Sequence, residues 1–202
     1  MIVVGVDPGL TRCGVGVISL EENTTPSRAP KFVRAQVLTT SPRFTHEDRL
    51  MQLDDKLCAL FGAFRSHEQV VVAIERPFFT KHNPNTAMGT AQVMGLVMVQ
   101  SRRKSYRVEH FTPSQVKTSV TGNGRAHKQQ VVNAVSILLG LNSGILAPPD
   151  AFDALAVALT CTNRGVGVVS ATSINKLENA ETRAQRMWKD AVRGVSNKPV
   201  RM

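Results

Sequence analysis

The chain has 202 residues, enough for one domain with a tail and for a single buried core. Lysine and arginine together number 25 against 15 aspartates and glutamates, so the formal net charge is +10, and 42% of the residues are hydrophobic. This composition excludes a wholly disordered protein, and the absence of any apolar run approaching about 18 residues excludes a membrane span. A basic domain of this kind has an anionic partner as its leading candidate, most commonly nucleic acid.

The N-terminus and the cysteines predict a cytoplasmic protein. The first ten residues, MIVVGVDPGL, lack the basic region of a signal peptide, and Asp7 interrupts their apolar stretch. The cysteines are odd in number, far apart and without CxxC spacing: Cys13, Cys58 and Cys161. We therefore expect reduced thiols rather than a disulfide framework or a zinc site.

The first forty residues predict three strands in an antiparallel meander. Ile2–Val6 is a β-branched run that Asp-Pro-Gly breaks, and alternating patterns follow at Gly14–Leu20 and Phe32–Thr39. Residues Glu21–Pro30 are polar and contain two prolines, which predicts a long exposed hairpin loop.

The apolar period then becomes helical. Apolar residues recur every three or four positions across His46–Phe64, which predicts an amphipathic helix. The unbroken apolar run Val70–Ile74 predicts a strand covered on both faces. Residues Thr86–Gln100 are uncharged and apolar nearly all round, so we expect a helix buried on more than one side.

The remaining elements complete one α/β domain over residues 1–164, a mixed sheet flanked by helices. A strand is expected at Tyr106–His110, and helices are expected from Thr112-Pro113, over Lys128–Leu139 and over Ala151–Thr160. Residues 165–202 are rich in Ser, Asn and Lys and predict a basic, flexible tail, in which Glu178–Val192 could form a short helix on contact.

Four carboxylates lie where strands end or the last helix begins: Asp7, Glu75, Asp150 and Asp153. Each has a structural alternative, because Asp7 could serve its turn and the last two could interact with a helix dipole. Glu75 is harder to explain, since an acid at the end of a buried strand rarely helps stability. Asp150 and Asp153 are three residues apart, so they project from one helix face.

Together the four acids predict a metal site. If the strands ending at Asp7 and Glu75 are parallel neighbours, both carboxylates emerge at one sheet edge. Gathering carboxylates costs several kcal/mol unless a cation neutralises them, and hard divalent ions prefer oxygen ligands. Two ions about 3.5–4 Å apart can clamp the attacking and leaving oxygens of a phosphodiester. Acids for metal in a basic domain indicate a nuclease.

The sequence resembles the RuvC family of Holliday-junction resolvases from about Ile2 to Cys161. Six motifs appear in order: GVDPGLTRCG from Gly5, AIE from Ala73, MGTAQ from Met88, TPSQVK from Thr112, VTGNGRAHK from Val120 and PDAFDALA from Pro149. The resemblance implies an RNase H-like fold with a mixed five-stranded sheet, and a crossover junction endodeoxyribonuclease that makes paired symmetric nicks during homologous recombination and DNA repair.

The resemblance also implies roles for individual residues and partners. It assigns the metal tetrad to the four carboxylates, phosphate contacts to Lys117 and Lys128, and a junction-inserting aromatic to Phe78. It implies a homodimer, Mg²⁺ with Mn²⁺ as substitute, two ions per site, and the RuvA–RuvB branch-migration complex as partner. From the residues alone, Arg125 and Lys128 follow a glycine turn and open a helix, which suits phosphate binding but equally a solvated helix start.

Three other functions remain as alternatives. The Asp-Pro-Gly turn is similar to the phosphate-binding turn of actin-like sugar kinases, but those need two lobes and the chain contains no second copy. A non-catalytic DNA-binding module would gain nothing by presenting four acids to phosphate. The same chemistry on an RNA–DNA hybrid is separated from junction cleavage only by the family resemblance.

Overall fold

The computed structural model describes residues 1–21, 29–65, 69–76, 84–141 and 148–163. The predicted strands are present as β1 (Ile2–Asp7), β2 (Arg12–Ser19), β3 (Lys31–Thr39), β4 (Val70–Glu75) and β5 (Arg107–Phe111). The helices are α1 (His46–Gly62), α2 (Pro84–Arg103), α3 (Pro113–Thr121), α4 (Lys128–Leu139) and α5 (Pro149–Asn163). Most of the predicted loop Glu21–Pro30 and the predicted tail 165–202 lie outside the described residues.

The strands form one mixed sheet in the order β3-β2-β1-β4-β5. The antiparallel meander is confirmed, because β1 pairs with β2 and β2 with β3 in that sense. Strand β4 then runs parallel to β1, with Val6 opposite Ile74, and β5 runs parallel to β4. The carboxyl ends of β1, β4 and β5 therefore meet at one edge of the sheet, as the position of the acids requires.

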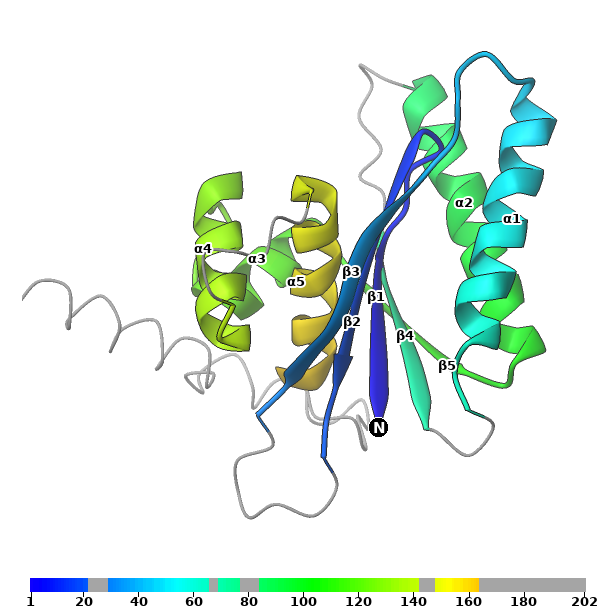
Figure 1. Ribbon diagram of the computed structural model, residues 1–202. Helices are drawn as coiled ribbons and strands as arrows, with labels where there is room; N and C mark the ends of the chain where they lie inside the picture. The colour runs from blue at the N-terminus through cyan, green and yellow to red at the C-terminus, as the bar shows by residue number, and fades with distance from the viewer. Residues whose placement is uncertain (22–28, 66–68, 77–83, 142–147, 164–202) are drawn as a thin grey trace, which may run out of the picture.

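Helices cover both faces of the sheet (Figure 1): α1 and α2 lie on one side, and α3, α4 and α5 on the other. Strand β1 alternates between the two layers, since Val4 and Val6 pack with α1 while Val3 packs with α5. Strand β4 is buried along its apolar length, which confirms that it is covered on both faces.

Helix α5 lies unusually close to the sheet because glycines face it. A Cβ at Gly5 would come within 2.0 Å of the Ala154 carbonyl oxygen, and one at Gly14 within 2.1 Å of the Asp150 carbonyl oxygen. Real Cβ atoms do not approach so closely, so only glycine permits this spacing. From Ala151 to Cys161 every residue of the helix except Asp153 is buried, and its alanines allow the opposite side to pack against α3 and α4.

Helix α2 departs from the sequence prediction. Within the described residues, one face, which includes Val93 and Val97, packs on the sheet layer, while Met88 is 63% exposed and Val99 is 49% exposed. Because α1 and the sheet leave this apolar face of α2 exposed, the expectation of burial on a second side is not met within one chain and stays a prediction for an assembly of two copies. None of the helices in the described parts of the chain is long and apolar enough to cross a membrane.

We expect Gly14→Ala to destabilise the protein by about 1–3 kcal/mol, as overpacking does, and to lower the Tm by several degrees. The added methyl must push α5 away from β2. Gly62→Ala at the end of α1 is the control, because among the described residues the added methyl meets no atom within 4 Å beyond its chain neighbours and its own helix backbone, and alanine favours a helix. Thermal melts of both variants measure the difference. An unchanged Tm for Gly14→Ala would contradict the close approach.

Candidate active site

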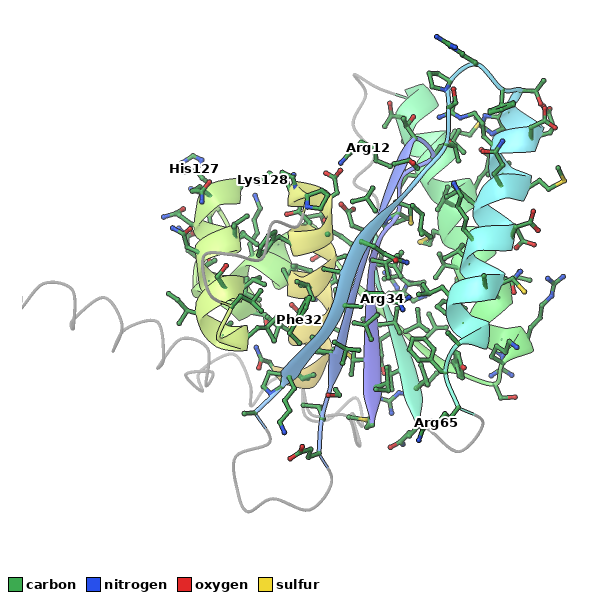
Figure 2. All side chains as sticks on the ribbon, in the orientation of Figure 1. Arg12, Phe32, Arg34, Arg65, His127 and Lys128 are labelled. Carbon is green, nitrogen blue, oxygen red and sulfur yellow. The ribbon has the colours of Figure 1, made fainter. Side chains whose placement is uncertain are left out.

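Strand alternation places three functional side chains on the α5 side of the sheet. Asp7 follows Val3 and Gly5 on β1, and Glu75 follows Val71 and Ala73 on β4, positions that face α5. On β2 the same face carries Gly14, and two residues earlier Arg12 begins the strand. Figure 2 shows Arg12 near the end of the molecule at which Lys128 and His127 lie, whereas Arg65 lies at the opposite end.

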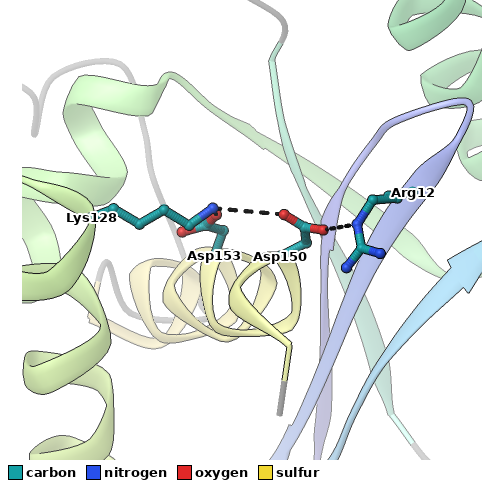
Figure 3. Close-up of polar contacts among 4 residues, drawn as sticks. All are labelled: Arg12, Lys128, Asp150 and Asp153. Atoms are coloured by element: carbon teal, nitrogen blue, oxygen red, sulfur yellow. Dashed lines mark hydrogen bonds and ion pairs between the residues drawn. The ribbon is translucent and has the colours of Figure 1, made fainter.

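The α5 acids are held by two cations (Figure 3). Lys128, the first residue of α4, places Nζ 2.8 Å from Asp153 Oδ2 and 3.6 Å from Asp150 Oδ1. Arg12 donates its Nε–H to Asp150 Oδ2 over 2.5 Å. Both carboxylates are about a quarter exposed. The prediction that Asp150 and Asp153 share one helix face is confirmed, because the same lysine contacts both.

The strand acids are partly buried as well, and burial is the largest cause of their raised pKa values. Burial, with the charges of Asp153 and Asp150 nearby, raises the pKa of Asp7 to about 6. Burial, followed by the charges of Asp7 and Asp153, raises the pKa of Glu75 to about 8, although Lys117 and Lys128 oppose the shift. These mutual interactions place all four predicted acids in one electrostatic cluster.

The turn between Asp7 and Arg12 is braced from the other helical layer. Thr40 Oγ1 donates to the Leu10 carbonyl over 2.6 Å, and the Thr40 amide donates to the Thr11 carbonyl over 3.1 Å. Arg49 of α1 donates through Nη2 to Thr11 Oγ1 over 2.6 Å and through Nε to Thr40 Oγ1 over 3.0 Å. The turn that carries Asp7 and Arg12 is therefore fixed at the end of β3 and by α1.

Sequence reasoning missed Arg12 and Arg49. Arg12 lies inside the first family-like motif, but the pattern alone does not show that its side chain reaches an acid 138 positions away. Arg49 has the periodicity of an ordinary surface residue on an amphipathic helix. A polar residue at the first position of a strand, facing the same side as the acids, is the signal that could have indicated Arg12.

The predicted DNA-contact residues are only partly described. Lys117 is half-buried and interacts with Glu75, and Lys128 is 54% exposed beside the α5 acids. Arg125 is exposed in the turn before α4, where its amide donates to Asn123 Oδ1 over 2.9 Å. Phe78 lies outside the described residues.

An open cleft of about 640 Å³ extends from the acids between β2 and α4. The residues that line it come from β2, α4 and α5: Arg12, Lys128, Gln129, Val132, Pro149 and Asp150. Cations line this cleft at both sides of Asp150, so it suits an anionic ligand that lies next to the carboxylates.

The donor set of the four acids fits hard divalent ions by its chemistry. In the described part of the chain, no three His, Cys, Asp or Glu side chains already stand together as a metal site. Lys128 and Arg12 contact the acids of α5 instead. The fit rests on chemistry: four carboxylates supply only oxygen ligands, which hard divalent ions prefer. Burial and the neighbouring acids raise the pKa values of Asp7 and Glu75, so an added cation would favour their charged forms.

Comparison with known proteins identifies the family. The model of the crossover junction endodeoxyribonuclease RuvC family matches residues 3–161. The chain belongs to the RuvC family. RuvC of Paenarthrobacter aurescens is 41% identical over 94% of both chains, and RuvC of Bifidobacterium animalis subsp. lactis is 37% identical over 98% of this chain and 96% of that protein.

Solved structures extend the RuvC likeness to the fold. Thermus thermophilus RuvC, solved alone and in complex with Holliday junction substrate, is 31% identical, with a TM-score of 0.68 over 80% of this chain and 93% of that chain. The predicted RNase H-like fold, a mixed five-stranded sheet with flanking helices, is thereby confirmed. The chain is a member of a family of endodeoxyribonucleases, as the motifs predicted.

We expect Glu75→Gln to raise the Tm of the metal-free protein at pH 8. The folded-state pKa of Glu75 is about 8 and its ordinary value 4.5, so the folded state binds more protons between these values. Stability therefore falls as pH rises from about 4.5 to about 8. Glutamine removes this penalty, so its advantage over wild type should shrink as the pH approaches 5.

Melts in EDTA from pH 5 to pH 8.5 test this expectation, with the exposed Asp55→Asn as control. An advantage of Glu75→Gln that is constant across the range would contradict the shifted pKa.

Proposed function

We propose that this chain resolves four-way DNA junctions by paired, divalent-metal-dependent nicks in opposed strands, in homologous recombination and DNA repair. Three observations support the proposal: membership of the RuvC family, the convergence of four carboxylates from β1, β4 and α5, and the cationic cleft beside them. The four converging carboxylates support cleavage rather than binding alone, because a protein that only binds DNA has no use for four acids that face phosphate.

Asp7, Glu75, Asp150 and Asp153 would hold the ions, which we propose to be Mg²⁺, with Mn²⁺ as a substitute, two in each site. When bound, such ions supply a nucleophile from water and stabilise the leaving oxygen of a phosphodiester. Lys117, which interacts with Glu75, and Lys128, at the start of α4, would neutralise the phosphate that enters. Arg125 would contact the DNA backbone farther along the same DNA strand. Phe78 stays a prediction as the residue that inserts at the crossover of the junction.

The proposed partners are junction DNA, a second copy of the chain and the RuvA–RuvB complex, in the cytoplasm where recombining DNA lies. The T. thermophilus complex with Holliday junction substrate supports the first of these. A dimer fits the two-fold symmetry of a four-way junction, because two sites related by a dyad place one nick on each opposed strand. The exposed apolar face of α2 supports this helix as the contact.

The function is tested by incubating the protein with Mg²⁺ and a synthetic four-way junction, a duplex, an RNA–DNA hybrid and a single strand. Paired nicks restricted to the junction are expected. Equal cutting of the hybrid would favour the alternative substrate.

Neutralising any acid of the tetrad is expected to abolish cleavage while junction binding survives. The variants are Asp7→Asn, Glu75→Gln, Asp150→Asn and Asp153→Asn, and the reason is that affinity comes from lysine and arginine while the acids hold the metal. EDTA should act in the same way. Gel-shift and nicking assays measure both properties, with Asp55→Asn on the exposed face of α1 as control. Substantial cutting by any two of the four variants would refute the tetrad.

Gly95→Arg is expected to give a folded monomer that does not resolve junctions. A Cβ at Gly95 meets no atom of the described residues within 4 Å, so the charge is tolerated in the monomer but not against a second α2. Gly62→Arg, equally free of such neighbours but on α1, should remain dimeric. Sedimentation and junction cleavage measure the outcome. A fully active monomer would refute α2 as the dimer interface.

A further inference from the structure

Arg12 has a fixed backbone and a side chain that reaches into the cleft. Its base follows the turn that Thr40 and Arg49 brace, and a Cβ at Gly9 would come within 2.4 Å of the Arg12 carbonyl oxygen, so this backbone is tightly placed. The side chain itself is 50% exposed and forms part of the cleft lining. Such a residue can change its partner without a change in the fold.

Both carboxylate oxygens of Asp150 have a cation as neighbour. Arg12 lies 2.5 Å from Oδ2 and Lys128 lies 3.6 Å from Oδ1. Lys128 has a shorter contact of 2.8 Å with Asp153, so Arg12 is the principal partner of Asp150. Any divalent cation that binds Asp150 at Oδ2 must therefore compete with the Arg12 guanidinium for the same lone pairs.

When a divalent cation displaces Arg12 from Asp150, the guanidinium remains in a cleft that suits an anion. Arg12 and Lys128 line the cleft with Gln129, and Arg12 presents a planar fork of donors that matches a phosphate. We propose that Arg12 serves two ligands in turn: it neutralises Asp150 while the carboxylates hold no divalent cation, and it engages a DNA phosphate in this cleft once Asp150 binds the cation. The second half rests on the function proposed above.

This exchange predicts effects of opposite sign on the two ligands. Removing the guanidinium removes a competitor of the divalent cation, so cation affinity without DNA should rise. It also removes a phosphate contact, so DNA affinity with the cation present should fall. A residue that only oriented Asp150 for the metal would instead lower cation affinity when removed.

The cation arm uses Mn²⁺ alone, with free Mn²⁺ followed by its electron paramagnetic resonance signal. Arg12→Gln is expected to bind Mn²⁺ about two- to fivefold tighter than wild type, the range for displacing one half-exposed ion pair. Arg107→Gln is the matched control: Arg107 has similar exposure and pairs with Glu109 over 3.2 Å outside the cluster, so its affinity should not change. Equal or weaker Mn²⁺ binding by Arg12→Gln would overturn the exchange.

The DNA arm measures junction affinity as a function of salt concentration, once in EDTA and once in Ca²⁺. Ca²⁺ is a hard cation that prefers oxygen ligands, and gels confirm that the DNA stays intact. In Ca²⁺, Arg12→Gln should flatten the salt dependence by about one unit of slope, and Arg12→Lys should largely restore it. In EDTA the slope change should be smaller, because Asp150 then retains Arg12. An equal change in both conditions, or none in Ca²⁺, would overturn the proposal.

The two proposals fail separately. The Mn²⁺ measurement involves no DNA, so it reports on Arg12 even if wild type does not cut junctions in Mg²⁺. Conversely, a wild type that cuts junctions while Arg12→Gln leaves both affinities unchanged would remove the role of Arg12 alone.

Discussion

The close packing of α5 on β1 and β2 is the constraint on which the rest of the site depends. Gly5 and Gly14 leave no side chain between the sheet and the helix backbone. Burial is the main cause of the raised pKa of Asp7, and repulsion from Asp153 and Asp150 adds to it. At ordinary helix-to-sheet spacing these two acids would stand farther from Asp7, and their contribution would weaken with distance. The same spacing brings Asp150 within reach of Arg12, which begins the strand that Gly14 keeps against α5.

Repulsion among the four carboxylates is reduced in two ways. Asp7 and Glu75 end strands between packed layers, where burial favours their protonated forms. Asp150, which lines the cleft, and Asp153 on the same helix face keep cations within 3.6 Å. The strand acids thus retain a strong preference for added positive charge, whereas the helix acids exchange one positive partner for another. The chain carries a net charge of +10. Part of this positive charge lies directly beside the acids, on Lys117, Lys128 and Arg12.

The order of the elements and the four acids could be predicted from the sequence because they depend on local periodicity. Val70–Ile74 is apolar enough to identify a central strand, and Lys128–Leu139 is the helix predicted, with the same ends. The role of Arg12 could not be predicted, since it requires the register of β2 and the spacing of α5, which are tertiary. What covers the second apolar face of α2 could not be predicted for the same reason: apolar composition shows that a face needs a partner but not whether the chain supplies it.

The site and the proposed dimer helix are joined by short polar contacts. Gln92 of α2 meets His46 of α1 over 2.7 Å, and one turn along α1 Arg49 donates to Thr11 in the turn between Asp7 and Arg12. Helix α1 is therefore bound at its first turns both to α2 and to the sheet edge that carries the strand acids. Since packed helices shift as units rather than deform, the position of α2 and that of the turn are not mechanically independent. If two copies associate through α2, as proposed above, a shift of that helix would be passed through α1 to the turn that follows Asp7.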